Sequence, residues 1–262
     1  MRYAIFSDIH GNLEALNAVV ASAEARGVEK YICVGDIVGY NANPSECLSV
    51  VQSLDLAAIV LGNNDEYMSD DANFLSVNET AMNSISWTRQ QLSEDQRAWL
   101  RQLEIKVVKS EDNITVVHAT LDSPEAWGYI YDVYHAEDNF TYQTTQICFC
   151  GHSHVPVLYK KGFSAEEGIF GVFEVKDWNK PSIYENVSEV TISVDFGCKY
   201  LVNVGSVGQP RNGDNRATFV IYNSGKRTLE RICVEYDIAS AQEKIRIAGL
   251  PELLALRLEQ GV

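Results

Sequence analysis

The fold is decided by the stretch Phe6-Ser7-Asp8-Ile9-His10-Gly11-Asn12, which closes the first apolar run of the chain, Tyr3-Ala4-Ile5-Phe6. The run predicts a strand. The aspartate and histidine that follow are two residues apart, so their side chains point to the same side at the strand end. The glycine permits a sharp turn, and the asparagine is a candidate helix N-cap. A capped turn with a surface histidine would explain the stretch alone. The functional alternative is a ligand site, because open α/β sheets bind ligands at such strand ends.

Composition bounds the class of protein. The chain has 262 residues, of which 46% are hydrophobic and 22% charged. These values are typical of a soluble globular protein, and we expect a single domain over residues 1–262. The formal net charge of -15 argues against binding to long nucleic acid. No apolar run approaches the roughly 20 residues that span a bilayer, and a strand follows Met1 in place of a secretory leader. We therefore expect no membrane partner and a cytoplasmic location.

The first third of the chain alternates strands with helices. Apolar residues recur at helical spacing from Leu13 to Ala23, strands are predicted over 31–34 and 57–61, and a helix over 45–53. This βαβαβ pattern predicts a largely parallel sheet flanked by helices. The second and third strands end, like the first, in glycine and polar residues: Gly35-Asp36 and Gly62-Asn63-Asn64-Asp65. The three ends should converge on one edge of the sheet.

The rest of the chain predicts two helices over 72–103 with a break near Ser93-Glu94, and then a β-rich half. A second sheet packed on the first would bury those strands. Residues 161–199 predict a hairpin-like insertion. It is either a lid over the site or a segment with no role in the site, such as a simple insertion or a dimer contact, and we slightly favour the latter. Residues 238–262 predict C-terminal helices broken near Gly249. Strands of the second half are expected at 114–117, 146–150, 155–160, 169–175, 190–195, 200–204, 217–223 and 228–235.

Chemistry-bearing residues gather at the predicted strand ends. Four of the five histidines lie there, together with two aspartates and an asparagine: His10, His118, His152, His154, Asp8, Asp36 and Asn63. A mixed nitrogen and oxygen donor set without thiolate suits Mn, Fe, Zn, Co or Ni better than Mg or Ca. Seven donors are too many for one tetrahedral ion. They suit two ions that share a bridging carboxylate.

These motifs resemble those of the calcineurin-like metallophosphoesterases, and most closely their small prokaryotic phosphodiesterase branch. The resemblance spans residues 8–216 and includes Val204-Gly205-Ser206-Val207-Gly208-Gln209-Pro210-Arg211, where Val204 replaces the usual proline. It implies an α/β (α+β) fold, a four-layer sandwich of two mixed β-sheets flanked by helices. It also implies two divalent transition metal ions, with manganese foremost. Asp8, His10, Asp36 and His154 would hold the first ion, and Asn63, His118, His152 and the bridging Asp36 the second.

The implied reaction is hydrolysis of a small phosphate ester by metal-activated hydroxide, followed by protonation of the leaving group. Here the sequence departs from the family, because Asn64 replaces the usual acid histidine of the third motif. Asparagine donates hydrogen bonds but cannot act as a general acid. Activity would then be limited to esters with acidic leaving groups, or the metal centre would serve binding alone. Asp65, normally the partner of that histidine, would orient Asn64 or replace a water.

Substrate contacts are less well indicated. Arg211 and Arg216 follow a glycine-rich turn and are candidates for a phosphate clamp at the site, although a surface loop with local ion pairs explains them too. The segment 120–131 carries three aromatic residues that could stack a nucleobase or pack against the insertion. A homo-oligomer is possible. The alternatives to a small-molecule esterase are a catalytically weakened metal- or nucleotide-binding relative and, ranked lowest, a protein phosphatase.

Overall fold

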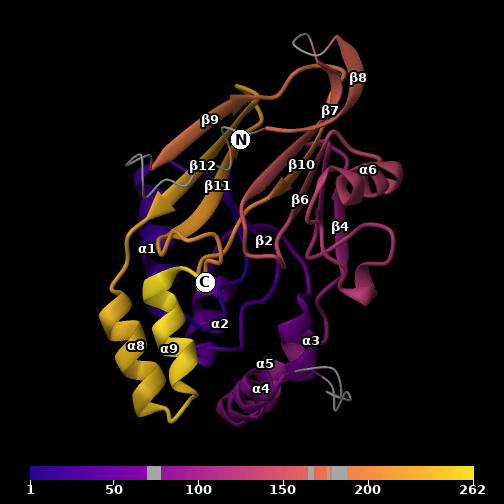
Figure 1. Cartoon of the computed structure of the whole chain (residues 1–262). Helices are drawn as coiled ribbons and strands as arrows, with labels where there is room; N and C mark the ends of the chain where they lie inside the picture. The colour runs from indigo at the N-terminus through magenta and orange to yellow at the C-terminus, as the bar shows by residue number, and fades with distance from the viewer. Residues whose placement is uncertain (70–77, 165–167, 176–177, 179–187) are drawn as a thin grey trace.

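The computed structural model describes residues 1–69, 78–164, 168–175, 178 and 188–262. Its first half alternates strands with helices and then continues through three helices to a short hairpin (Figure 1). The elements are β1 (Arg2–Phe6), α1 (Leu13–Ala25), β2 (Lys30–Cys33), α2 (Pro44–Ser53), β3 (Leu56–Ile59), α3 (Asn63–Ser69), α4 (Glu79–Gln91), α5 (Glu94–Leu100), β4 (Lys106–Lys109) and β5 (Ile114–Val117).

The second half is β-rich and ends in a pair of helices. Its elements are the short 3-10 helix η1 (Pro124–Ala126), α6 (Val133–Tyr142), β6 (Ile147–Cys150), β7 (Val157–Ser164), β8 (Ile169–Glu174), β9 (Glu189–Ser193), β10 (Lys199–Asn203), β11 (Ala217–Asn223), β12 (Thr228–Val234), α8 (Ile238–Ile247) and α9 (Glu252–Gln260). The predicted break between the two C-terminal helices is confirmed. Within the described ranges, every helix is too short or too polar to cross a membrane.

Two six-stranded sheets form the centre of the molecule. The first has the order β3-β2-β1-β11-β12-β9, and the second the order β4-β5-β6-β10-β7-β8. In the first sheet β1, β2 and β3 are parallel, as the βαβαβ pattern predicts, while β11 joins the other edge of β1 in antiparallel register. In the second sheet β6 runs parallel to β5 and β10. Both sheets are therefore mixed.

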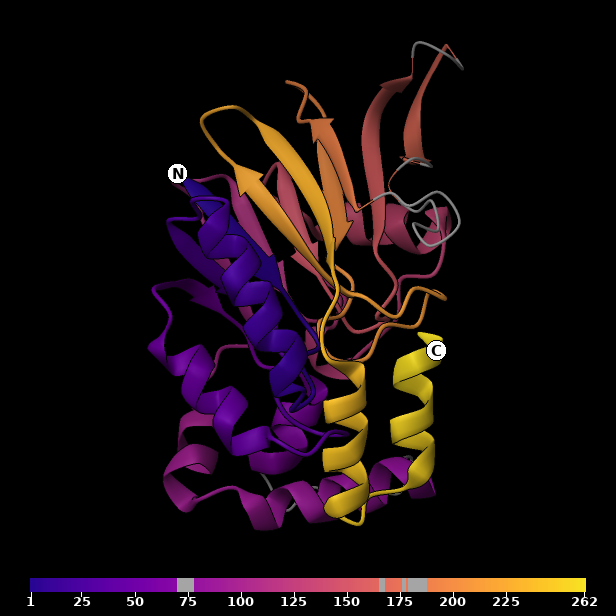
Figure 2. The ribbon, with the colours of Figure 1, turned by 90° about the vertical axis from the view of Figure 1, so that its left-hand side faces the viewer.

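Alternation along β1 explains why the sheets stack. Tyr3 and Ile5 belong to the apolar cluster between the two sheets, whereas Ala4 and Phe6 belong to the cluster beneath α1 and α2. On the outer face of the second sheet, a third cluster includes Phe140 of α6. The layers are thus helices, sheet, sheet and helix, which confirms the predicted four-layer sandwich (Figure 2).

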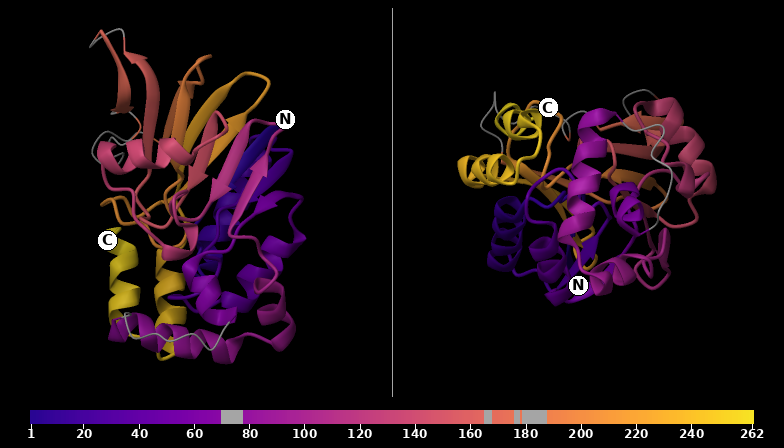
Figure 3. Two further views of the ribbon diagram at one scale, coloured as in Figure 1. Left: turned by 90° about the vertical axis from the view of Figure 1, so that its right-hand side faces the viewer. Right: turned by 90° about the horizontal axis from the view of Figure 1, so that it is seen from below.

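Local sequence signals set the helix ends. Asn12 accepts a hydrogen bond from the Ala15 N–H and begins α1, as predicted. Ser93 and Gln96 form a reciprocal capping box that separates α5 from α4, which explains the predicted break. At the lower end of the sandwich, α8 and α9 pack side by side and α4 crosses beneath them (Figures 2 and 3).

Part of the predicted insertion is a hairpin that extends the second sheet. Strand β8 pairs with β7 in antiparallel register, and β9 pairs with β12 in the other sheet. Because β7 begins at Val157 and its eight residues rise about 26 Å, the strand carries the chain away from His154 toward the far end of the sheet. Residues 165–167, 176–177 and 179–187 of the insertion lie outside the described residues. Both interpretations of the insertion stay predictions.

Several elements were not predicted, among them α3 and β4. Helix α3 begins at Asn63, in a stretch interpreted as a polar turn, and β4 is an edge strand in which two lysines flank two valines. Residues 70–77, part of the predicted helical region, lie outside the described residues.

Gly208 joins the second half of the chain to the β1 loop. Its N–H donates to the Asp8 carbonyl oxygen, and a Cβ there would overlap the Ile9 carbonyl oxygen. We expect Gly208→Ala to lower the free energy of unfolding by about 3 kcal/mol, because backbone atoms cannot move aside as a side chain can. Urea unfolding of the metal-free protein measures this. Gly225→Ala is the matched control, since a Cβ there meets nothing nearer than 3.5 Å; equal losses would contradict the prediction.

Candidate metal centre

The predicted donor residues follow the carboxyl ends of five strands, drawn from both sheets. Asp8 follows β1, Asp36 follows β2 and Asn63 follows β3, while His118 follows β5 and His152 follows β6. Two hydrogen bonds join the sheets at this edge. The His118 ring donates from Nδ1 to the Val34 carbonyl oxygen at 2.7 Å, and the His152 N–H donates to Asp8 Oδ2 at 3.1 Å. The edge is therefore fixed before any ligand binds.

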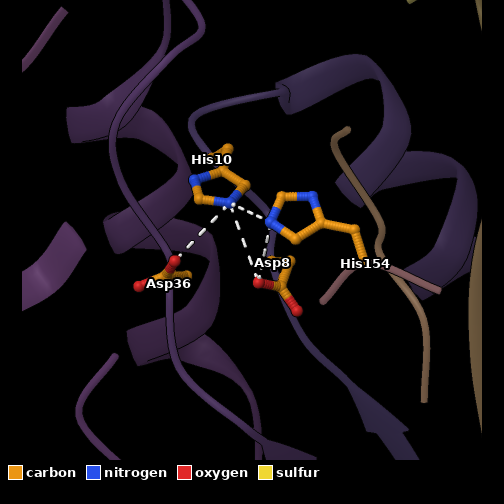
Figure 4. Close-up of side chains that lie close together, drawn as sticks. All are labelled: Asp8, His10, Asp36 and His154. Atoms are coloured by element: carbon orange, nitrogen blue, oxygen red, sulfur yellow. Dashed lines mark hydrogen bonds and ion pairs between the residues drawn. The ribbon is translucent and has the colours of Figure 1, made fainter. Parts of the chain in front are cut away.

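Four side chains form a tight, fully buried cluster: Asp8, His10, Asp36 and His154 (Figure 4). Their candidate ligand atoms all lie within 4.8 Å of one another. Nε2 of His154 lies 3.2 Å from Asp8 Oδ1, and Nε2 of His10 lies 3.6 Å from Asp36 Oδ2. This geometry matches the first ion's predicted ligand set.

The hydrogen bonds of His10 and His154 determine where their protons lie. Nδ1 of His10 is 3.1 Å from the Val38 carbonyl oxygen, and Nδ1 of His154 is 2.6 Å from the Gln209 carbonyl oxygen. A carbonyl can only accept, so each neutral ring carries its proton on Nδ1. The two Nε2 atoms then face each other as bare lone pairs at 3.1 Å. Such an arrangement is unfavourable without a cation between them, and it is how metal-binding histidines are held.

A second group of donors lies on the other side of Asp36. Nε2 of His118 lies 3.5 Å from Asp36 Oδ2, and the rings of His118 and His152 are 5.1 Å apart. His152 uses its Nε2 to bind the Trp127 carbonyl oxygen at 2.9 Å, which leaves Nδ1 as its donor atom. Fifteen buried side-chain polar atoms of the described residues have no hydrogen-bond partner, and three of them are Asp8 Oδ1, Asn63 Oδ1 and His118 Nε2. All three are predicted metal ligands, so the donors fit a pair of cations.

Strained backbone is concentrated at this edge. Five of the donor residues have positive φ angles, a region that non-glycine residues rarely adopt: Asp8 at 54°, His10 at 49°, Asp36 at 53°, His152 at 67° and His154 at 61°. Each such residue costs on the order of 1–3 kcal/mol, and strain of this kind persists mainly at functional sites.

Burial and mutual attraction shift the acid–base properties of the donors. Burial raises the pKa of Asp8 to about 7 and lowers the pKa of His10 to about 4 and of His152 to about 3. Burial acts to raise the pKa of Asp36, but attraction to His118 outweighs it and the pKa falls below its usual value. The reverse holds for His118, where attraction to Asp36 outweighs burial and raises the pKa to about 9. In the metal-free protein a protonated His118 thus provides the positive charge that Asp36 requires.

Metal affinity should therefore increase with pH. Both the His118 imidazole, with a pKa of about 9, and the Asp8 carboxyl, with a pKa of about 7, must lose a proton to bind a cation. Below these values protons compete, so we expect the apparent affinity for Mn²⁺ to rise about tenfold per pH unit for each proton displaced. Calorimetric titration at pH 6 and pH 8 measures this. An affinity that does not change over this range would contradict the assignment of His118 as a ligand.

Asn64 and Asp65 support the cluster from the first turn of α3. The Asn64 backbone N–H donates to Asp36 Oδ1 at 2.8 Å, and its side-chain Nδ2 donates to Asp36 Oδ2 at 2.7 Å. Asp65 accepts from the backbone N–H groups of residues 37 and 38 and of Gly62. The Asp65 carboxylate therefore holds the loop after β2 in place. The structure brings both residues to the site, but as groups that position Asp36 and its loop.

Of the two predicted substrate arginines, the structure brings one to the site. Arg211 lies 6.0 Å from the centre of the Tyr40 ring, which packs on His10 with ring centroids 4.7 Å apart. Arg216 instead forks onto Asp214 and reaches the Ser188 hydroxyl. Since Asp214 is only two residues away, the local ion pair that was the simpler alternative explains Arg216.

Sequence reasoning missed two residues next to the centre, Tyr40 and Arg257, whereas Trp127 and Tyr129 belong to the aromatic segment 120–131 that it singled out. Tyr40 and Arg257 line a pocket with Arg211 and Tyr129, and Tyr129 stacks on His152 with ring centroids 4.1 Å apart. Trp127 contributes its backbone carbonyl, as described above, and its ring lies 5.8 Å from that of His118. The only sequence signal for Tyr40 is that it directly follows Gly39, in the loop after β2. Nothing in the sequence around Arg257 marks it.

The two-sheet sandwich places this chain among α/β proteins, and its buried Asp/His cluster at the strand ends could hold a metal ion. A family model described as the calcineurin-like phosphoesterase superfamily domain matches residues 1–226. The chain belongs to this superfamily, as its motifs predicted.

Similar proteins cover the whole chain. An uncharacterized protein of Methanocaldococcus jannaschii is 36% identical over 260 residues, which are 98% of this chain and 97% of that protein. The crystal structure of a metallophosphoesterase from Sphaerobacter thermophilus is 34% identical, covers 100% of this chain and 99% of its own, and has a TM-score of 0.82. A hypothetical protein of Pyrococcus horikoshii shares the fold at 19% identity, with 100% and 98% coverage and a TM-score of 0.76.

Proposed function

We propose that this protein hydrolyses a small phosphate ester at a centre of two divalent transition metal ions, with Mn foremost and Fe, Zn, Ni or Co as alternatives. One observation carries the proposal. The bare Nε2 atoms of His10 and His154 face each other at 3.1 Å beside Asp8 Oδ1, which has no hydrogen-bond partner. A bound cation would stabilise this concentration of lone pairs. Family membership supplies the reaction class.

The distances support the division of donors between two ions. Asp8, His10, Asp36 and His154 would hold the first, and Asn63, His118, His152 and Asp36 the second. Asp36 Oδ2 lies 3.6 Å from His10 Nε2 and 3.5 Å from His118 Nε2, so this carboxylate stands between the two groups. A bridging role for Asp36 follows from that position.

The chemistry that such cations supply when bound is a lowered pKa for a shared water and neutralisation of charge on the phosphate oxygens. The chain itself orients the donors: backbone carbonyl oxygens hold the four imidazoles, and Asn64 holds Asp36. Arg211 would attract the substrate phosphate at the edge of the centre.

No histidine is left to protonate the leaving group. Four of the five histidines are metal-ligand candidates, and the fifth, His135, is exposed and bound to Asp132 at 2.7 Å. Asn64 cannot supply a proton. The protein should therefore act mainly on esters whose leaving groups depart unprotonated.

Metal analysis combined with a panel of aryl phosphodiesters tests the proposal. We expect two ions per chain, loss of turnover after chelation, recovery with Mn²⁺, and a steep fall in kcat/KM as the leaving-group pKa increases. His118→Ala should lose one ion and most turnover, whereas His135→Ala, the matched control, should lose neither. Turnover that survives complete metal removal would contradict the metal mechanism. A flat dependence on leaving-group pKa would contradict the role assigned to Asn64.

A catalytically weakened metal- or nucleotide-binding relative is the second candidate, and the contact between Asn64 and Asp36 favours it. An amide that serves the metal site in place of an acid would suit a binding protein. The same panel separates the two: two bound ions with no turnover of bis(p-nitrophenyl) phosphate would favour the binding protein.

A further inference from the structure

A pocket of about 560 Å³ opens beside the metal centre. Tyr40 and Tyr129 line it, and both rings also contact metal-ligand candidates: Tyr40 meets His10 edge-on, and Tyr129 stacks on His152. One wall therefore belongs to both the pocket and the metal site. A ligand whose phosphate lies on the metal ions would extend into this pocket.

Two arginines line the pocket from distant parts of the chain. Arg211 comes from the loop after β10, and Arg257 from α9. Among the described residues, no aspartate or glutamate side chain forms an ion pair with either. Arg211 Nη2 donates to Gln209 Oε1 at 2.8 Å, its buried Nε has no hydrogen-bond partner, and Arg257 Nε donates to the main-chain oxygen of Val262.

The two guanidinium groups repel each other. Burial lowers the pKa of Arg257, and the charge of Arg211 lowers it further. In a chain with a net charge of -15, two neighbouring arginines without carboxylate partners are unusual. An anion between them would remove the repulsion, and paired guanidinium groups match the geometry of phosphate oxygens.

The other charged group of the pocket does not cancel this site. Glu79 also lines the pocket, but it is exposed, so water screens its charge. Glu79 is the first residue of α4, and the positive end of the helix dipole partly offsets the carboxylate.

Arg257 lies outside the residues that the family model matches. The family model ends at residue 226, whereas α8 and α9 span 238–260. These helices form an apolar cluster of their own that packs against Tyr40 and Trp87. The C-terminal helices thus complete a pocket that residues 1–226 alone would leave without Arg257.

We propose that this pocket binds a second phosphate group of the substrate, so that the preferred substrates carry two phosphoryl groups: one at the metal centre and one between Arg211 and Arg257. This inference rests on the proposed function for the first of these positions. It specifies the substrate class, because it excludes simple monoanionic diesters as the best ligands.

Calorimetry with the Mn²⁺-loaded protein tests the inference without requiring turnover. The probes are methylphosphonate and a series of α,ω-alkane bisphosphonates with one to five methylene groups. We expect the bisphosphonate of the best length to bind at least about tenfold tighter than methylphosphonate, in line with a charge-assisted contact. Arg257→Gln should lose this advantage. Arg246→Gln, the matched control, should keep it, because Arg246 is an exposed arginine of the same helix pair bound to Glu252.

Arg211→Gln provides a second variant and should also lose the advantage, so the test does not depend on the folding of one protein. The inference is overturned if no length binds more than twofold tighter than methylphosphonate, or if the advantage survives in Arg257→Gln. Its failure is distinguishable from that of the proposed function. Aryl ester hydrolysis without a bisphosphonate advantage removes only the inference, whereas the advantage without hydrolysis removes only the hydrolase assignment.

Discussion

Asp36→Asn is expected to reduce turnover by more than about 10³-fold, beyond the loss that follows removal of one preorganised donor. Asp36 lies between the two donor groups, so its carboxylate would serve both ions. The amide keeps the size of the side chain but removes its charge. We therefore expect metal analysis to show fewer than two ions per chain and thermal unfolding to show a smaller stabilisation by Mn²⁺.

Asp138→Asn is the matched control. It removes the same charge, and Asp138 is exposed on α6. It should retain both ions and full turnover. If Asp36→Asn kept two ions and near-normal kcat, the bridging assignment would be wrong.

Asn64→His is expected to raise kcat/KM by about 10²-fold on esters with poor leaving groups, within the 10²–10⁴-fold range of general acid catalysis. Esters with acidic leaving groups should gain little, because they depart without a proton. The gain comes at the cost of the hydrogen bond from Asn64 to Asp36. The larger histidine ring must also fit against Gly39. The space there is tight, because a Cβ added to Gly39 would lie 3.1 Å from the Asn64 side-chain oxygen. The slope of log kcat/KM against leaving-group pKa is the measurement.

Asn64→Ala separates the acid from the lost hydrogen bond. It removes the donor to Asp36 without adding an acid, so it should lower metal affinity and leave the slope unchanged. An equal gain in Asn64→Ala and Asn64→His would mean that release of Asp36, and not proton donation, limits the reaction.

The fold could be predicted wherever hydrophobic periodicity and strand ends agree. The alternation of strands with helices in the first third of the chain predicted the parallel pairing of β1, β2 and β3, and the glycine-rich strand ends predicted the edge where they meet. Helix α3 could not be predicted, because its first residues interact with other segments: Asp65 binds the backbone of the loop after β2. Tertiary contacts of this kind leave no periodic signal. Edge strand β4 was missed for a different reason: it is short and half exposed, so its hydrophobic pattern is weak.

The candidate site likewise has a part that local sequence predicts and a part that it does not. The donor residues stand in local motifs at strand ends, and the structure gathers them at one edge. The substrate side of the site depends on long-range packing. Arg216 satisfies its charge on Asp214, two residues away, whereas Arg257 reaches the pocket only because α9 packs there. The neighbouring Asp214 accounts for Arg216, whereas no local pattern points to Arg257.

The pairing of β1 with β11 has a consequence for how the molecule is made. Tyr3 pairs with Tyr222, so one edge of the N-terminal strand finds its neighbour only when the ribosome has synthesised most of the chain. Closure over such a sequence separation is slow. His154 and the Gln209 carbonyl oxygen that orients it also emerge late. A nascent chain that ends before residue 209 would therefore hold an incomplete donor set, so a metal ion that needs the whole set would be acquired only in the last stage of maturation.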